Sequence, residues 1–221
     1  MYLAAVFACV AIVLSGNARA RSVDERINVS VYYESHCPDS RDFIVKELFP
    51  NFCKVQQYLN LNLVPFGKAY STDDGDFRCQ HGEKECRGNT IHNCALKRIQ
   101  DPIARVGYVN CAMRNPDQPG QIDVTCVKKF GLDVDDVQRC YTSQEGYDLM
   151  LIAESATLEN TSAERTGPKF VPTIVFEGVY SDRDQVAAFE DFERTICAKL
   201  SARGKQNVCS NGSIVNRTTC S

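Results

Sequence analysis

The sequence carries little net charge, and its charged residues are well mixed. Its 25 basic and 28 acidic residues give a formal charge of −3 at pH 7. No basic patch is present, which excludes the usual electrostatic footprint of a nucleic-acid-binding protein, and no run of one sign indicates a charged tail. Internal repeats, a glycine-rich phosphate loop and a Ser-His-Asp order are also lacking.

Long apolar runs are equally scarce. The only one, residues 3–14, is followed by Ala18-Arg19-Ala20. It is too short to span a bilayer, and the pattern predicts a secretory signal peptide over residues 1–20. We therefore expect a mature chain that begins near Arg21 and has no membrane span. Because the C-terminal RTTCS is no retention signal, secretion is the default destination.

Cysteine, in contrast, is abundant. Of twelve cysteines, Cys9 leaves with the signal peptide, so eleven remain. This density in a secreted chain predicts disulfide bonds, and the odd number leaves at least one thiol free or paired outside the chain. Four N-x-S/T sequons predict a glycoprotein, at Asn28, Asn160, Asn211 and Asn216.

The first part of the mature chain predicts a β-α-β unit. Residues 27–33 and 61–66 are rich in β-branched and apolar residues, as strands are. Between them, apolar residues recur at helical spacing, at Ile44, Leu48, Phe52, Val55 and Leu59. Pro50 should kink or split this helix. Cys37 stands at the helix entrance, directly before Pro38, which suits a first helical position.

The rest of the chain predicts one domain over residues 21–200 with a large insertion. Residues 79–165 hold six cysteines and short amphipathic stretches, which indicates a disulfide-rich, mostly helical insertion. An apolar segment then carries Pro172 and has its turn at Gly178, and a closing helix runs to Leu200. The tail, residues 201–221, contains two further cysteines and two sequons.

The order strand, Cys37, helix and a distant Val-Pro-Thr segment is similar to that of the thioredoxin fold, an α/β fold. Helix-terminal N–H groups and the helix macrodipole stabilise a cysteine thiolate. A protonated His36 would add to this effect, Asp39 would oppose it, and the Ser40 hydroxyl could donate a hydrogen bond to the sulfur. Two plainer alternatives stay open: a structural disulfide at Cys37, and no chemical role for Ser40.

The most specific motif is CQHGEKECRGNTIHNC at residues 79–94. It closely resembles the signature of the gamma-interferon-inducible lysosomal thiol reductase family, and YYES before Cys37, LVPFG at residues 63–67 and VPTI at residues 171–174 extend the resemblance. The resemblance implies a thioredoxin-like domain with a helical insertion, acting on protein disulfides in endosomes or lysosomes. It places the nucleophile at Cys37 and substrate-backbone contacts at Val171 and a cis Pro172. The remaining cysteines form the expected disulfide framework: Cys53, Cys79, Cys86, Cys94, Cys111, Cys126, Cys140, Cys197, Cys209 and Cys220.

The chain departs from that family at Ser40, because the family's active site is C-x-x-C and here it reads C-P-D-S. The second thiol normally resolves the mixed disulfide that the first one forms. Without it, we expect no cofactor but a need for an external small thiol. Cys53 is a poor substitute: it lies ~24 Å away along a helix, whereas bridged Cα atoms lie within ~7 Å. Cys53 could instead pair with Cys220, or Cys220 could link two chains.

Three functions are compatible with these residues. The first is disulfide exchange through Cys37, with activity weakened or lost because of Ser40 and with disulfide-containing proteins as substrates. The second is a non-catalytic secreted binding or host-defence protein on the same scaffold, and the third a disulfide-linked structural glycoprotein. A zinc site at His81 and His92 is not expected, because the neighbouring cysteines lack the close C-x2–4-C spacing.

Overall fold

A computed structural model describes residues 25–115, 120–162 and 166–215 of the 221-residue chain. The signal peptide expected over residues 1–20, the sequon at Asn216 and Cys220 lie outside the described residues. Among the helices that are described, none is long and apolar enough to cross a membrane.

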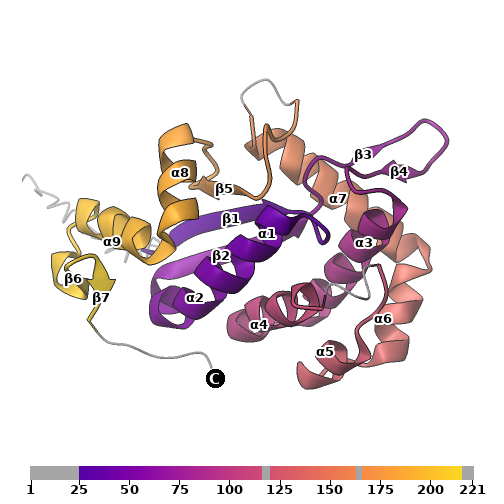
Figure 1. The fold of residues 1–221 in the computed structure, drawn as a ribbon, viewed down its shortest axis with the longest axis horizontal. Coiled ribbons are helices and arrows are strands. Elements are labelled where there is room, and N and C mark those ends of the chain that lie inside the picture. Colours follow the sequence, from indigo (N-terminus) through magenta and orange to yellow (C-terminus); the bar gives the residue numbers. More distant parts are fainter. Residues whose placement is uncertain (1–24, 116–119, 163–165, 216–221) are drawn as a thin grey trace, which may run out of the picture.

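A three-stranded sheet forms the centre of the molecule (Figure 1). Its middle strand, β1 (Ile27–Tyr33), pairs in parallel with β2 (Leu59–Pro65) and antiparallel with β5 (Thr173–Phe176), in the order β2-β1-β5. β1 and β2 keep one register from Ile27↔Leu59 to Tyr33↔Pro65. β5 turns back at Glu177 and Gly178, both with positive φ, to a single bridge between Phe176 and Val179.

One continuous helical segment connects β1 to β2. It begins as α1 (Pro38–Asp42), becomes a π-helix (Phe43–Leu48), and continues as α2 (Phe49–Val55) and a 3-10 turn (Gln56–Tyr58). Pro50 therefore does not split the segment. The wider π turn directly before it changes the hydrogen-bonding register, which lets the chain pass a residue that has no N–H to donate.

The two faces of β1 pack against different partners, because successive side chains of a strand point to opposite faces. Val29, Val31 and Tyr33 belong to the large core shared with the helical segment 38–55, the insertion and the C-terminal helix. Tyr32 faces a second, smaller core that contains Met150 and Val175. Both faces of the central strand are thus covered.

The insertion between β2 and β5 is mostly helical, and its helices lie in the right-hand part of the view in Figure 1. A small hairpin comes first, and five helices follow: β3 (Tyr70–Ser71), β4 (Phe77–Arg78), α3 (Glu83–Arg98), α4 (Pro102–Met113), α5 (Val124–Lys129), α6 (Val134–Tyr141) and α7 (Gln144–Asn160). Three disulfides lie within it: Cys79–Cys86, Cys94–Cys140 and Cys111–Cys126.

The closing helix predicted from the sequence is two helices, α8 (Asp182–Glu190) and α9 (Phe192–Ala202). Asp191 separates them with extended backbone (φ −153°, ψ 91°) and caps α9 by accepting a hydrogen bond from the Arg194 N–H. A 3-10 turn (Gln206–Val208) and a hairpin of β6 (Cys209–Ser210) and β7 (Ser213–Ile214) follow, tied to α9 by the Cys197–Cys209 disulfide.

Candidate active site around Cys37

Cys37 is a free, buried cysteine at the N-terminus of α1. It is the N-cap residue, with extended backbone (φ −68°, ψ 123°), and 6% of its surface is exposed. Its N–H donates to the Glu34 carbonyl at 3.3 Å, and its own carbonyl accepts from the Arg41 N–H at 3.0 Å. The thiol is therefore held where the chain changes from strand to helix, with the helix N-terminus beside it.

Val171 and Pro172 lie against this thiol. The peptide bond between them is cis, and the Cys37 Sγ lies 3.8 Å from the Val171 carbonyl oxygen. The buried Gln185 of α8 holds this loop: its Nε2 donates to the Pro172 carbonyl at 3.0 Å, and its Oε1 accepts from the Ile174 N–H at 2.7 Å. Sequence reasoning missed Gln185, since nothing local marks a helix glutamine as the partner of a loop.

Ser40 is fully buried one turn into α1. Its Oγ accepts a hydrogen bond from the Glu34 N–H at 3.3 Å. The hydroxyl at the position of the absent second cysteine thus joins the helix back to the end of β1. The suggestion that this hydroxyl donates to the Cys37 sulfur stays a prediction.

His36 is a weak source of positive charge for the thiol. Burial lowers the pKa of His36 below its usual value, which disfavours the imidazolium form, although the nearby Glu85 works in the opposite direction. Its Nδ1 lies 3.3 Å from the Ser35 hydroxyl. Its Nε2 is buried without a hydrogen-bond partner among the residues that the structure describes.

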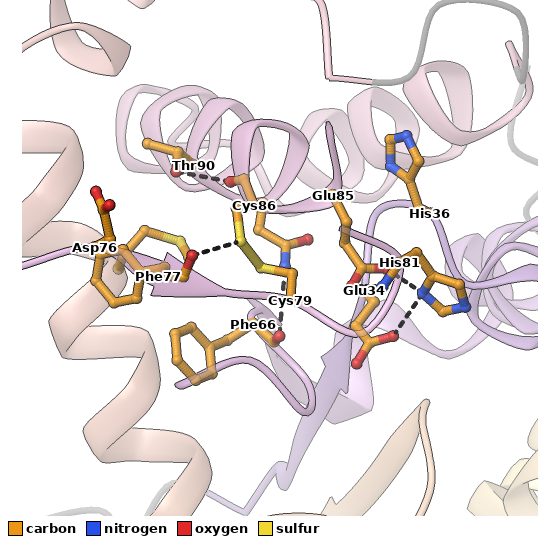
Figure 2. Close-up of a disulfide and its surroundings, with 12 residues drawn as sticks. Glu34, His36, Phe66, Asp76, Phe77, Cys79, His81, Glu85, Cys86 and Thr90 are labelled. Carbon is orange, nitrogen blue, oxygen red and sulfur yellow. Dashed lines mark hydrogen bonds and ion pairs between the residues drawn. A yellow bond between two sulfur atoms is a disulfide. The ribbon is translucent and has the colours of Figure 1, made fainter. Parts of the chain in front are cut away.

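Glu34 is the first residue of the loop that leads into Cys37. Its side chain lies close to those of His81 and Glu85, two residues of the 79–94 motif (Figure 2). The His81 Nδ1 lies 2.5 Å from Glu85 Oε2 and 3.3 Å from Glu34 Oε2. Both glutamates are fully buried. Burial and the facing Glu85 charge raise the pKa of Glu34 to about 7.

The same three residues are also the group of described side chains that could be considered for a metal ion. A zinc ion bound to both a nitrogen and an oxygen at about 2.0–2.2 Å would hold those atoms roughly 3 Å apart. The 2.5 Å separation of His81 Nδ1 and Glu85 Oε2 is that of a hydrogen bond. In this geometry His81 Nδ1 and Glu85 Oε2 are hydrogen-bonded to each other.

Helix α3 also contacts Ser35, the residue between Glu34 and His36. The buried Asn89 accepts the Ser35 N–H at 2.9 Å, and the Ser35 hydroxyl donates to the Glu85 carbonyl at 3.2 Å. Gly88 makes this approach possible, since a Cβ there would overlap the Ser35 Oγ. The motif of residues 79–94 thus packs on the loop before Cys37.

His92, the second histidine that was weighed as a zinc ligand, belongs to the packed interior. His92 is almost fully buried, and its Nδ1 lies 3.0 Å from the Tyr33 hydroxyl. Burial lowers the pKa of His92 to about 3, so the ring is neutral over the physiological range. It borders a cavity of about 120 Å³ beside Cys37, which Ile91 and Tyr108 also line.

Cys53 is buried in α2 and disulfide-bonded, so it does not offer a second thiol to Cys37. The described sequons differ in setting. The amide nitrogens of Asn28 and Asn160 donate to Glu177 and to the Ala156 carbonyl, whereas Asn211 lies exposed in the turn between β6 and β7. Glycosylation stays a prediction, and Asn211 is the described position best suited to it.

The β1-helix-β2 unit, the antiparallel β5 that follows a cis-proline, and the closing helices define a thioredoxin-like fold with a helical insertion. A free cysteine at the first helix N-terminus, opposite that proline, places the chain in the class of thiol-disulfide oxidoreductase folds.

Comparison with known proteins gives the family. Residues 28–130 match the family model described as gamma interferon inducible lysosomal thiol reductase (GILT). The chain is 34% identical over 191 residues to a gamma-interferon-inducible lysosomal thiol reductase-like protein of Anopheles gambiae, covering 80% of this chain and 78% of the relative. It is also 34% identical over 196 residues to the thiol reductase of Carassius auratus, covering 84% and 73%. The chain belongs to the gamma-interferon-inducible lysosomal thiol reductase family.

Among solved structures, MdbA, a thiol-disulfide oxidoreductase from Corynebacterium diphtheriae, is similar with a TM-score of 0.48 and 12% sequence identity. The similarity covers 77% of this chain and 85% of MdbA.

Proposed function

We propose that this protein is a monothiol member of its family, which attacks disulfides of protein substrates with Cys37 and depends on an external small thiol for release. The observation that carries the proposal is the free Cys37 thiol at a helix N-terminus, 3.8 Å from the carbonyl of the cis-proline loop. Val171 and Pro172 would hold the substrate backbone beside the sulfur. A secreted or lysosomal glycoprotein is the setting we propose for this activity.

The chemistry follows from Ser40. The Cys37 thiolate attacks one sulfur of the substrate disulfide, forms a mixed disulfide and releases the other substrate sulfur as a thiolate. A serine hydroxyl cannot attack the mixed disulfide. One small thiol must then displace the substrate from Cys37, and a second must regenerate the Cys37 thiol. Two thiols are oxidised to one disulfide for each substrate disulfide that is reduced.

The test is reduction of a protein disulfide at pH 5 by wild type, Cys37→Ala, Ser40→Ala and Ser40→Cys, with and without added cysteine. Wild type without thiol should accumulate a mixed disulfide at Cys37, visible on a non-reducing gel. Added cysteine should convert it to product, and Cys37→Ala should do neither. Ser40→Cys should release substrate without added thiol, whereas Ser40→Ala should behave like wild type.

A binding protein on the same scaffold is the second candidate. The low exposure of Cys37, 6%, favours it, because a substrate disulfide must reach the sulfur. If wild type forms no mixed disulfide and shows no turnover with any small thiol, the oxidoreductase proposal is wrong and the binding function remains.

A further inference from the structure

Glu34, His81 and Glu85 lie outside the proposed reaction, and they form a close cluster of ionisable groups. One ligand atom of each lies within 4.8 Å of the other two. Glu34 comes from the end of β1, and the other two from the 79–86 loop and the start of α3, which the Cys79–Cys86 disulfide closes. Figure 2 shows the His81 ring beside the two carboxylates, with one ring nitrogen directed toward both and His36 directed away from them.

One carboxylate oxygen of this cluster, Glu34 Oε2, lacks a hydrogen-bond donor among the described residues. Glu85 is satisfied at both oxygens, by the His81 N–H at 3.1 Å and by the His81 Nδ1 at 2.5 Å. Glu34 Oε1 accepts the Lys68 N–H at 2.8 Å. Glu34 Oε2 is buried and has no hydrogen bond among the described residues. With the tautomer of His81 that carries its proton on Nδ1, that N–H is used by Glu85, and Glu34 Oε2 is left to carry a proton of its own.

Among the described residues, His81 is the charge that favours an ionised Glu34, and it lowers the pKa of Glu34 by less than burial and Glu85 raise it. The β2–β3 connection contributes only the Lys68 backbone N–H to Glu34. His36, on the same loop, and Lys84, on α3, are the other titratable groups near the cluster, and burial disfavours a charged His36. A deprotonated Glu34 would therefore face the Glu85 carboxylate in a buried site, where two like charges repel strongly.

Glu34 is also directly connected to the nucleophile. Its carbonyl accepts the Cys37 N–H at 3.3 Å, and its N–H donates to Ser40 Oγ at 3.3 Å. Asn89 accepts the N–H of the intervening Ser35. The side chain of Glu34 has little room to move inward, because a Cβ at Gly67 would already overlap it. A displacement of Glu34 must therefore shift the backbone that places Cys37.

We propose that Glu34, His81 and Glu85 are positioning residues, a proton-dependent clamp that fixes the loop of residues 34–36 and thereby Cys37. The clamp is closed while Glu34 carries its proton and loosens when that proton is lost. The motif of residues 79–94 then has a defined task, because its His81, Glu85 and Asn89 are the groups that hold the loop. The idea that the clamp assists catalysis by Cys37 rests on the proposed function. The idea that the clamp fixes the loop is independent of that function.

Amide hydrogen exchange tests the clamp without any assay of activity. Peptides that contain residues 34–37 are followed by mass spectrometry at pH 5.5 and pH 8, with rates corrected for the intrinsic pH dependence of exchange. Since the pKa of Glu34 rises from 4.5 to about 7, full loss of its proton allows up to about a 300-fold increase in loop opening. We expect the wild-type loop to lose at least tenfold protection at pH 8.

Glu34→Gln should abolish this loss, because the amide keeps the shape and can donate to Glu85. Glu85→Gln removes the same carboxylate–carboxylate repulsion by neutralising the other partner. This variant replaces Glu34→Gln in the test if Glu34→Gln does not fold. Glu83→Gln is the matched control, since Glu83 lies exposed on the same helix and pairs with Arg87, and it should exchange like wild type. Equal protection at both pH values in wild type, or an undiminished loss in Glu34→Gln and Glu85→Gln, would overturn the proposal.

The pH profile of kcat/KM for disulfide reduction adds a second readout. Wild type should lose activity near pH 7, and in Glu34→Gln this descending limb should be absent. Loss of loop protection without any turnover would refute the proposed function and leave the clamp intact. Turnover without a change in loop protection would refute the clamp alone.

Discussion

Replacement of Glu34 by glutamine should change how the stability of the protein depends on pH. The folded-state pKa of Glu34 is raised from 4.5 to about 7, and each pKa unit corresponds to about 1.4 kcal/mol. The sign follows from the raised value. Stability from the protonated group is fully present below about pH 4.5 and is lost as the pH rises through about 7. Between pH 5 and pH 8, Glu34 should therefore cost wild type about 2–3 kcal/mol of unfolding free energy.

Other groups contribute in the opposite direction, so the difference between the two proteins is the quantity to measure. His92, with its pKa lowered to about 3, is buried and neutral, and stability from it is lost as the pH falls below about 6.5. Glu34→Gln retains His92 and differs only at the clamp. At pH 5 the two proteins should differ by no more than about 1 kcal/mol.

Urea unfolding with the disulfides intact, at pH 5 and pH 8, measures both free energies. At pH 8 the variant should be more stable than wild type, relative to their difference at pH 5. Glu83→Gln should follow wild type at both values. If the stability difference between wild type and Glu34→Gln is the same at pH 5 and pH 8, Glu34 is ionised in the folded protein over this range and the reasoning fails.

Three further substitutions test the contacts of the loop and the second core. Gly88→Ala should cost about 1–3 kcal/mol of unfolding free energy, because the added methyl overlaps the Ser35 Oγ; an unchanged urea midpoint would contradict the close packing. Asn89→Ala should cost about 1–3 kcal/mol, because it leaves the Ser35 N–H without its acceptor, and hydrogen exchange should locate the effect at Ser35 rather than across the domain. Met150→Ala should cost about 2–5 kcal/mol through a cavity in the smaller core, and a loss under 1 kcal/mol in urea would show that the core refills.

Much of the scaffold could be predicted because its signals are local. The strand of residues 27–33, the amphipathic helix and Pro38 at its start are each visible within a few residues, and together they place Cys37. The resemblance of the Val171–Ile174 segment and of the 79–94 motif to the family predicted the thioredoxin-like fold, and this prediction is confirmed. The family is confirmed as well.

The parts that escaped prediction depend on contacts between distant segments. Cysteine parity left the pairing open, and pairs such as Cys94–Cys140 follow from how α3 and α6 pack. Glu34 was not predicted as a functional residue, because nothing in the segment YYES distinguishes a glutamate that follows a strand. Its role depends on contacts with His81 and Glu85, which lie about fifty residues further along the chain. The spacing of His81 and Glu85, four residues, was the available signal that they act together.

The position of α3 has a consequence for how this domain can be divided. By sequence, α3 belongs to the insertion, and residues 79–165 look like a module that could be removed. By contact, it places Glu85 beside the Glu34 carboxyl group and supplies both hydrogen-bond partners of Ser35, Asn89 and the Glu85 carbonyl. A shortened chain that joined β2 directly to β5 would retain every element of a minimal thioredoxin-like fold, yet it would leave the Ser35 N–H, two residues before the thiol, without its acceptor. The insertion therefore takes part in holding the loop before Cys37, and a shortened domain would have to retain α3.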